Sequence, residues 1–142
     1  MHTNDERRQG IRIFIVDPHP LVREGLAMLL TQKGFDICGE ADNSSEALQG
    51  ILRTRPDLAM VDIDLGGSSG VELIFELSRR APEIPVLVCA LAAGPLHVER
   101  AMEAGAKGYI TKQEVSKTAF TAVKEILEGG VFFGHEVYGE KE

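Results

Sequence analysis

The chain of 142 residues is long enough for one domain with a single hydrophobic core, and its formal net charge is −7 at neutral pH. This acidic balance argues against direct binding of nucleic acid through a broad basic face. No apolar run is long enough to span a membrane, and the first ten residues lack the apolar segment of a signal peptide, so we expect a cytoplasmic protein without a membrane contact.

Short apolar segments alternate with amphipathic ones along the chain. The predicted strands are runs rich in β-branched, aromatic and other apolar residues, at 11–16, 35–39, 58–61, 86–91 and 109–110. Each is followed by a segment with helical periodicity, and these predicted helices cover 20–33, a stretch that begins at Asn43, 71–80, 96–104 and 115–128. Asn43 followed by Glu46 resembles a capping box, which supports a helix start there.

The first and last predicted helices are expected to turn apolar faces toward the core. In the first helix the face consists of Leu21, Val22, Leu26, Leu29 and Leu30. In the last helix it consists of Ala119, Phe120, Val123, Ile126 and Leu127.

The cysteines, Cys38 and Cys89, each lie inside an apolar strand-like run. This placement favours buried, reduced thiols over a disulfide. The spacing of cysteine and histidine does not resemble a zinc site.

Five strands that alternate with helices predict an α/β fold with a parallel sheet and right-handed crossovers. The expected architecture is the flavodoxin-like doubly wound (βα)5 arrangement, with strand order 2-1-3-4-5. We predict that the domain covers residues 11–129. Residues 1–10 are expected to be a disordered tail, and 130–142 a tail or the start of a linker to an output domain.

Acidic residues follow two of the predicted strands. Asp17 comes after the first strand, and Asp62 and Asp64 come after the third, where the chain enters a Gly/Ser loop. In this fold ligands bind at the carboxyl ends of the strands, and the crevice lies between strands 1 and 3. Asp17 and Asp62 should therefore meet at a ligand site. The alternative is that Asp62 caps the following turn and Asp64 is a solvated loop residue.

The chain resembles the receiver domain of bacterial two-component response regulators. The motifs that carry the resemblance are the segments 17–26 (DPHPLVREGL), 56–62, 66–70 and 105–112 (GAKGYITK). The segment HPLVREGL is similar to the corresponding segment of the LuxR-type subfamily, in which a helix-turn-helix domain follows the receiver. The resemblance implies a signalling module that regulates transcription or another output, with no enzymatic activity beyond self-phosphotransfer.

The same resemblance assigns roles to individual residues. Asp62 is the phospho-acceptor, and Lys112 contacts the phosphoryl group. Mg²⁺ would bind through Asp17, Asp62 and Asp64, the last by its backbone carbonyl or its side chain. The switch positions are Ala90 and Tyr109. The implied partners are a sensor histidine kinase and an output domain in cis or a partner protein.

Two residues depart from the family pattern. Pro18 replaces the second acidic residue after strand 1, and Ala90 replaces the Ser/Thr that ends strand 4. Neither side chain offers an oxygen, so we expect weak Mg²⁺ binding and weakened phosphorylation. Gly66 also stands where many relatives have proline, which should loosen that loop.

Three alternatives remain open from the sequence. A conventional, phosphorylatable receiver competes with a degenerate one. A haloacid-dehalogenase-type phosphatase would use Asp62 as nucleophile and Asp64 as general acid. The third alternative is a small-molecule binder of the same fold, but this chain has Pro18 and Pro20 after strand 1, where such a binder would have a phosphate-cradling glycine loop.

We expect a monomer or weak homodimer, with contacts through the first and last helices or through the fourth and last helices.

Overall fold

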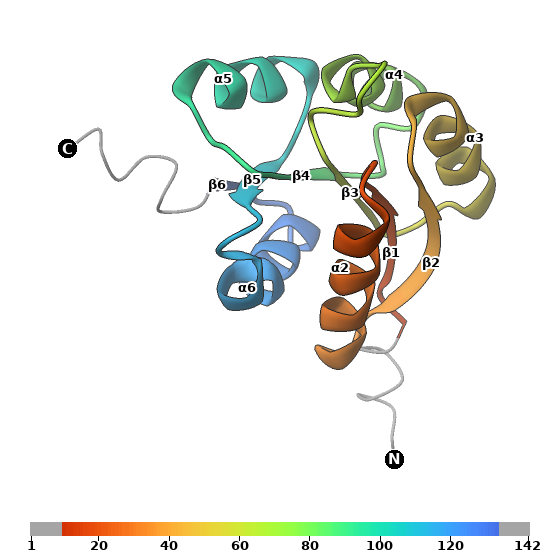
Figure 1. Cartoon of the computed structure of the whole chain (residues 1–142), viewed down its shortest axis with the longest axis vertical. Coiled ribbons are helices and arrows are strands. Elements are labelled where there is room, and N and C mark those ends of the chain that lie inside the picture. Colours follow the sequence, from red (N-terminus) through yellow and green to blue (C-terminus); the bar gives the residue numbers. More distant parts are fainter. Residues whose placement is uncertain (1–9, 134–142) are drawn as a thin grey trace.

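The computed structural model describes residues 10–133 as an open, doubly wound α/β domain (Figure 1). The strands are β1 (Arg12–Val16), β2 (Asp36–Ala41), β3 (Leu58–Val61), β4 (Val86–Ala90), β5 (Gly108–Thr111) and β6 (Phe132–Phe133). The helices are α2 (Pro20–Gln32), α3 (Ser44–Thr54), α4 (Gly70–Arg80), α5 (Pro95–Ala104) and α6 (Val115–Leu127). The tails were predicted at 1–10 and 130–142, and of these residues the structure describes only 10 and 130–133.

The strands form one parallel sheet in the order β2-β1-β3-β4-β5-β6. Figure 1 shows α2 and α6 on one face of this sheet and α3, α4 and α5 on the other. The predicted flavodoxin-like order of the first five strands is confirmed. Among residues 10–133, no helix has both the length and the apolar character needed to cross a membrane.

The central strands are buried on both faces, which explains their continuous apolar runs. In β1, Ile13 and Ile15 join the core beneath α2 and α6, whereas Phe14 and Val16 join the core beneath α3, α4 and α5. This alternation follows from the two-residue period of a strand. The sheet is therefore a rigid platform between two cores, and the loops at its carboxyl edge are anchored by it.

Short polar side chains begin two of the helices. Asn43 Oδ1 accepts a hydrogen bond from the Glu46 N–H at 2.9 Å, which confirms the predicted start of α3. At α4, Ser69 Oγ accepts from the Val71 N–H at 3.1 Å. The cap at Ser69 holds the end of the loop that follows β3.

The predicted inward faces of the first and last helices were partly wrong. Leu26 and Leu30 of α2 are buried, but Leu21 is 82% exposed. At 3.6 residues per turn, Leu21 lies roughly 140° around the helix from Leu26 and roughly 180° from Leu30. Phe120 and Leu127 of α6 lie roughly 100° from its buried stripe and are 43% and 36% exposed. One sheet face covers only one stripe of each helix, so these side chains remain at the surface.

The sheet continues into a sixth strand that the sequence analysis did not predict. Phe132 pairs with Gly108 and Phe133 pairs with Tyr109. A Cβ atom at position 108 would lie 2.6 Å from the Phe132 carbonyl oxygen, so glycine allows this close approach. Two residues are too few to show a strand period in the sequence.

At Gly105 a left-handed backbone and a close neighbour both disfavour a methyl group. It ends α5 with φ +119°, and an added Cβ would lie 2.5 Å from Ser78 Oγ, which donates to the Ala104 carbonyl. Gly105→Ala should lower the free energy of unfolding by about 2 kcal/mol, measured by urea denaturation. Gly34→Ala is the control, because Gly34 has φ +99° and an added Cβ would have no contact within 4 Å among the described residues beyond its chain neighbours; it should cost about 1 kcal/mol. Equal losses would show that the Ser78 contact is unimportant.

Candidate functional site

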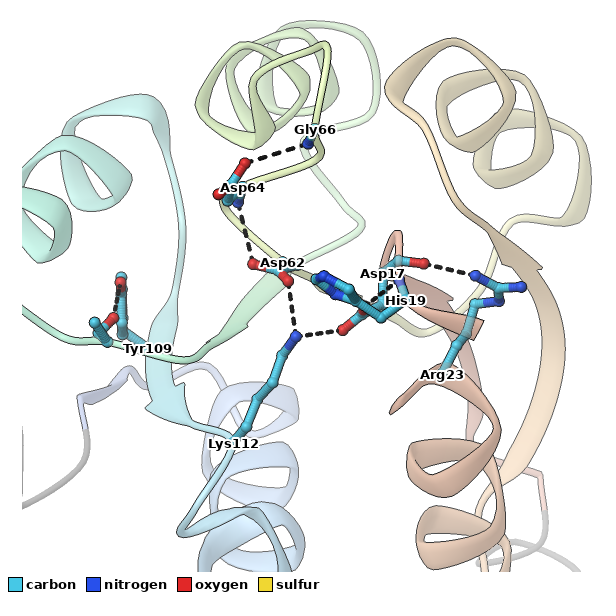
Figure 2. A network of polar contacts seen from close by, with 9 residues as sticks. Asp17, His19, Arg23, Asp62, Asp64, Gly66, Tyr109 and Lys112 are labelled. Carbon is cyan, nitrogen blue, oxygen red and sulfur yellow. Dashed lines mark hydrogen bonds and ion pairs between the residues drawn. The ribbon is translucent and has the colours of Figure 1, made fainter. Parts of the chain in front are cut away.

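The carboxyl ends of three strands bring two carboxylates and one ammonium group together. Asp17 follows β1, Asp62 follows β3 and Lys112 follows β5 (Figure 2). Asp17 and Asp62 are only 1% and 5% exposed. Since β1 and β3 are neighbours in the sheet, the convergence of Asp17 and Asp62 predicted from the sequence is confirmed.

Lys112 bridges the two carboxylates. Its Nζ lies 2.6 Å from Asp17 Oδ2 and 2.8 Å from Asp62 Oδ2. Burial alone lowers the pKa of Lys112, but the hydrogen bonds and negative charges of Asp17 and Asp62 outweigh it, and the net pKa is raised. Lys112 is therefore a fixed cation that neutralises part of the charge of the aspartate pair.

Asp17 is held by contacts that the sequence analysis missed. Its Oδ1 accepts a hydrogen bond from the His19 N–H at 2.9 Å and lies 3.2 Å from His19 Nδ1. The guanidinium of Arg23 donates to the Asp17 carbonyl oxygen at 2.7 Å and also contacts Glu40 on β2. An Asp-x-His turn and an arginine one helical turn further on were the available signals in the sequence.

Asp64 lies apart from the buried pair. Its N–H donates to Asp62 Oδ1 at 3.1 Å, while its own Oδ1 accepts from the Gly66 N–H at 3.2 Å. Asp62 thus caps the turn after β3, which was the alternative role that the sequence left open for it. It also pairs with Lys112. The Asp64 side chain is exposed and helps to shape the loop (Figure 2).

Ala90 and Tyr109 lie on the β4–β5 side of the site. Ala90 is buried and lines a small cavity together with Asp62, Asp64, His19 and His97. The methyl group of Ala90 supplies no hydrogen bond to this cavity.

Tyr109 points into the protein. It is fully buried, and its hydroxyl donates to the Ala92 carbonyl oxygen at 2.7 Å. Burial and, secondarily, the charge of Asp62 raise the pKa of Tyr109 to about 12. The phenol therefore stays neutral and keeps its donor at physiological pH.

A buried carboxylate supports the turn that carries Lys112. Glu114 is 3% exposed and accepts from the Thr111 N–H at 2.9 Å. This contact closes the loop between β5 and α6, so the position of Lys112 is fixed on both sides. The sequence analysis did not single out Glu114, because glutamate is common near helix starts, where its charge interacts favourably with the helix dipole.

The thiols are free and play no part in this arrangement. Cys89 is buried and Cys38 half-buried, so the predicted burial is fully confirmed only for Cys89. Burial raises the pKa of the Cys89 thiol to about 12, which makes it unreactive.

The side chains at this site supply some, but not all, of the ligand atoms that a divalent cation needs. Asp17, His19 and Asp62 each offer a ligand atom, and these atoms lie within 4.8 Å of one another. Asp17 Oδ2 is buried, is paired with Lys112 as an ion, and has no hydrogen bond of favourable geometry. Pro18 adds no donor to this set, so the oxygen donors are fewer than Mg²⁺ prefers.

Comparison with known proteins matches residues 13–124 to the response regulator receiver domain family. The chain is 34% identical to the methanol utilization control regulatory protein MoxX of Paracoccus denitrificans, over 84% of this chain and 55% of that protein. It is 33% identical to the DNA-binding transcriptional activator DevR/DosR of Mycobacterium tuberculosis, with the same coverages. The chain thus spans just over half the length of these curated relatives.

Among solved structures, the fold is similar to a LuxR-family two-component response regulator from Aurantimonas sp. SI85-9A1. The TM-score is 0.86 at 31% identity, covering 91% of this chain and 93% of that one. These matches do not support the phosphatase alternative. In that alternative Asp64 would be the general acid, whereas its carboxylate accepts a hydrogen bond from the loop backbone.

Removal of the Lys112 charge should destabilise the domain. Lys112→Met leaves two buried carboxylates without their cation, so the free energy of unfolding at pH 7 should fall by about 3 kcal/mol. Because the Lys112 pKa is raised on folding, its contribution is complete below the ordinary lysine pKa of about 10.4 and is lost progressively as pH rises from there through the raised pKa of the folded state. Urea denaturation at pH 7 and pH 11 measures both effects.

Lys117→Met is the control for this experiment, since Lys117 is exposed on α6. It should change stability by less than about 0.5 kcal/mol at either pH. A Lys112→Met variant as stable as wild type at pH 7 would contradict the view that the bridge stabilises the fold.

Proposed function

The chain belongs to the response regulator receiver domain family, and on this premise we propose that it is a receiver in which Asp62 takes up a phosphoryl group only weakly. The observation that carries the proposal is Lys112, which pairs with both Asp17 and Asp62. The missing oxygens at Pro18 and Ala90 support it.

The chemistry is transfer of a phosphoryl group between an anionic donor and a carboxylate. A carboxylate oxygen of Asp62 attacks phosphorus of a phosphohistidine or a small phosphodonor, the bond to the leaving group breaks, and an aspartyl phosphate forms. A divalent cation such as Mg²⁺, held by Asp17, Asp62 and the Asp64 backbone or side chain, would screen the charge of the two reactants. Lys112 then neutralises a phosphoryl oxygen by a charge-assisted hydrogen bond.

Three features of the chain weaken this reaction. Lys112 must give up part of its contact with Asp17 or Asp62 before it can bind a phosphoryl oxygen. Pro18 cannot hold the cation, and Ala90 cannot donate a hydrogen bond to the phosphoryl group. A hydrogen bond to a charged group contributes roughly 1.5–3 kcal/mol, so loss of the hydroxyl alone lowers uptake by roughly tenfold or more.

The switch function of Ala90 and Tyr109 is part of the same proposal. In receivers with a hydroxyl at position 90, that group would link the phosphoryl group to the aromatic ring. Here the Tyr109 ring is already inside and hydrogen-bonded to Ala92. The inward position of the ring supports a domain whose output face changes little on phosphorylation.

The output is proposed from the length and names of the relatives. They are about twice as long as the matched region, and one is a DNA-binding transcriptional activator. We therefore propose that this domain regulates transcription through a helix-turn-helix domain in cis or a partner protein, and that it acts in the cytoplasm. A sensor histidine kinase is the partner that would supply the phosphoryl group. The net charge of −7 of the whole chain argues against direct binding of nucleic acid by the receiver through a broad basic face.

Self-association should be weak and should involve the α2–α6 side. Phe120 is 43% exposed, stacks on Phe35 with ring centroids 6.0 Å apart, and lines a groove with Leu127. Sedimentation velocity should show a monomer in dilute solution and a dimer only at high concentration, with the dimer lost in Phe120→Glu. Phe75→Glu on α4 is the matched control, as Phe75 is 54% exposed. A tight dimer that persists in Phe120→Glu would contradict this assignment.

Phosphoryl uptake can be tested directly by repair of the two departures. Wild type and a Pro18→Asp, Ala90→Thr double variant are incubated with millimolar Mg²⁺ and a small phosphodonor or beryllofluoride. Mass spectrometry and chemical-shift changes should show at least roughly tenfold more modification of the double variant. Asp62→Asn in the repaired background is the control and should abolish the response.

Equal modification of wild type and the repaired variant would overturn the proposal, and Asp64 would then supply the missing ligand. If the repaired variant also fails to respond, the cause lies outside positions 18 and 90, and the assignment of the weakness to them is wrong.

A further inference from the structure

His19 changes the chemical character of the cation site, because its side chain reaches the buried aspartate pair. Figure 2 shows the imidazole ring between the carboxylates of Asp62 and Asp17. One ring nitrogen of His19 and one oxygen from each aspartate lie within 4.8 Å of one another. The third donor of the site is therefore nitrogen, where a carboxylate at position 18 would have supplied oxygen.

We infer that the site formed by Asp17, His19 and Asp62 binds a borderline transition-metal ion, of the Zn²⁺ or Co²⁺ type, in preference to Mg²⁺. Imidazole is a good ligand for these ions, whereas Mg²⁺ takes oxygen ligands almost exclusively. The inference concerns the crevice of the proposed function but does not depend on phosphoryl uptake.

The charge and burial of the site favour a cation there. Asp17 and Asp62 carry two negative charges against the single positive charge of Lys112, which leaves a net charge of −1. Asp17 Oδ2 is buried, and its partner among the described residues is the ammonium group of Lys112, 2.6 Å away. An ion that binds Asp17 and Asp62 would share these oxygens with Lys112 or displace it.

The geometry around His19 is suited to ligation. The His19 N–H already donates to Asp17 Oδ1 at 2.9 Å, so the backbone of residue 19 is anchored beside the carboxylate. Its side chain is 60% exposed, so the ring can adjust to an ion without disturbing the core. Pro18 and Pro20 flank the residue and restrict the backbone of this turn. The entropy lost when His19 binds a metal is thereby reduced.

The test is metal binding by the full chain, freed of metal with a chelator and measured without a phosphodonor. Isothermal titration with Zn²⁺ and with Mg²⁺ is carried out on wild type, His19→Ala and His97→Ala. His97 lines the same cavity but is not one of the three grouped ligands, so it is a matched control. His19→Ala should weaken Zn²⁺ binding at least roughly tenfold and Mg²⁺ binding less than about threefold. His97→Ala should change neither.

Two further measurements identify the ligand and the place. Nitrogen-15 shifts of the imidazole rings should show that Zn²⁺ moves a ring nitrogen of His19 and leaves those of His97 in place. Asp62→Asn should weaken both metals, because it removes a shared carboxylate. His19→Asp should restore an all-oxygen donor set and raise the affinity for Mg²⁺ while lowering that for Zn²⁺.

Several results would overturn the inference. Equal losses of Zn²⁺ and Mg²⁺ affinity in His19→Ala would mean that His19 only shapes the loop. Unchanged Zn²⁺ binding in His19→Ala or Asp62→Asn would place the ion elsewhere on the chain. An equal effect of His97→Ala would reject His19 as the specific ligand. None of these measurements involves phosphoryl uptake. A negative result here would therefore reject the metal site without rejecting the proposed function, which has a separate test.

Discussion

The ion pairs of Lys112 with Asp17 and Asp62 are the interaction on which the rest of this site depends. Two buried carboxylates at adjacent strand ends would repel each other strongly in a medium of low dielectric constant. The ammonium group of Lys112, 2.6 and 2.8 Å away, makes their close approach tolerable. The same contact occupies the oxygens that a phosphoryl group or a metal ion would need. The ion pairs that stabilise the fold and the binding of a phosphoryl group or a metal ion therefore compete for the same oxygen atoms.

The surrounding structure holds the three charged residues from outside the site. Arg23 binds the backbone carbonyl of Asp17, and Glu114 closes the turn after Lys112. Gly70 lies against the backbone of Asp62, where a Cβ atom would collide with the Asp62 carbonyl oxygen. These contacts come from the starts of three different helices. The site is thus preorganised, and little of it can move without loosening a helix.

The departures at positions 18 and 90 have related consequences. Proline at position 18 offers no side-chain ligand, and in the cation site that we propose the third donor is a ring nitrogen of His19. Ala90 leaves the cavity next to Asp62 without a hydroxyl, and the Tyr109 hydroxyl binds the Ala92 carbonyl instead. A single chain thereby combines a receiver fold with a site in which the side chains at positions 18 and 90 carry no oxygen.

The sequence by itself determined the first five strands, their order, and the meeting of Asp17 with Asp62. These follow from local periodicity and from the rule that parallel strands place their carboxyl ends at one edge. Only the tertiary structure decided which atoms Lys112 contacts, that Asp64 turns toward the loop, and that His19 joins the pair. It also decided that Phe120 stays exposed and that Phe132 extends the sheet. Such outcomes depend on distances and packing between segments far apart in the chain, which the residue pattern of one segment does not contain.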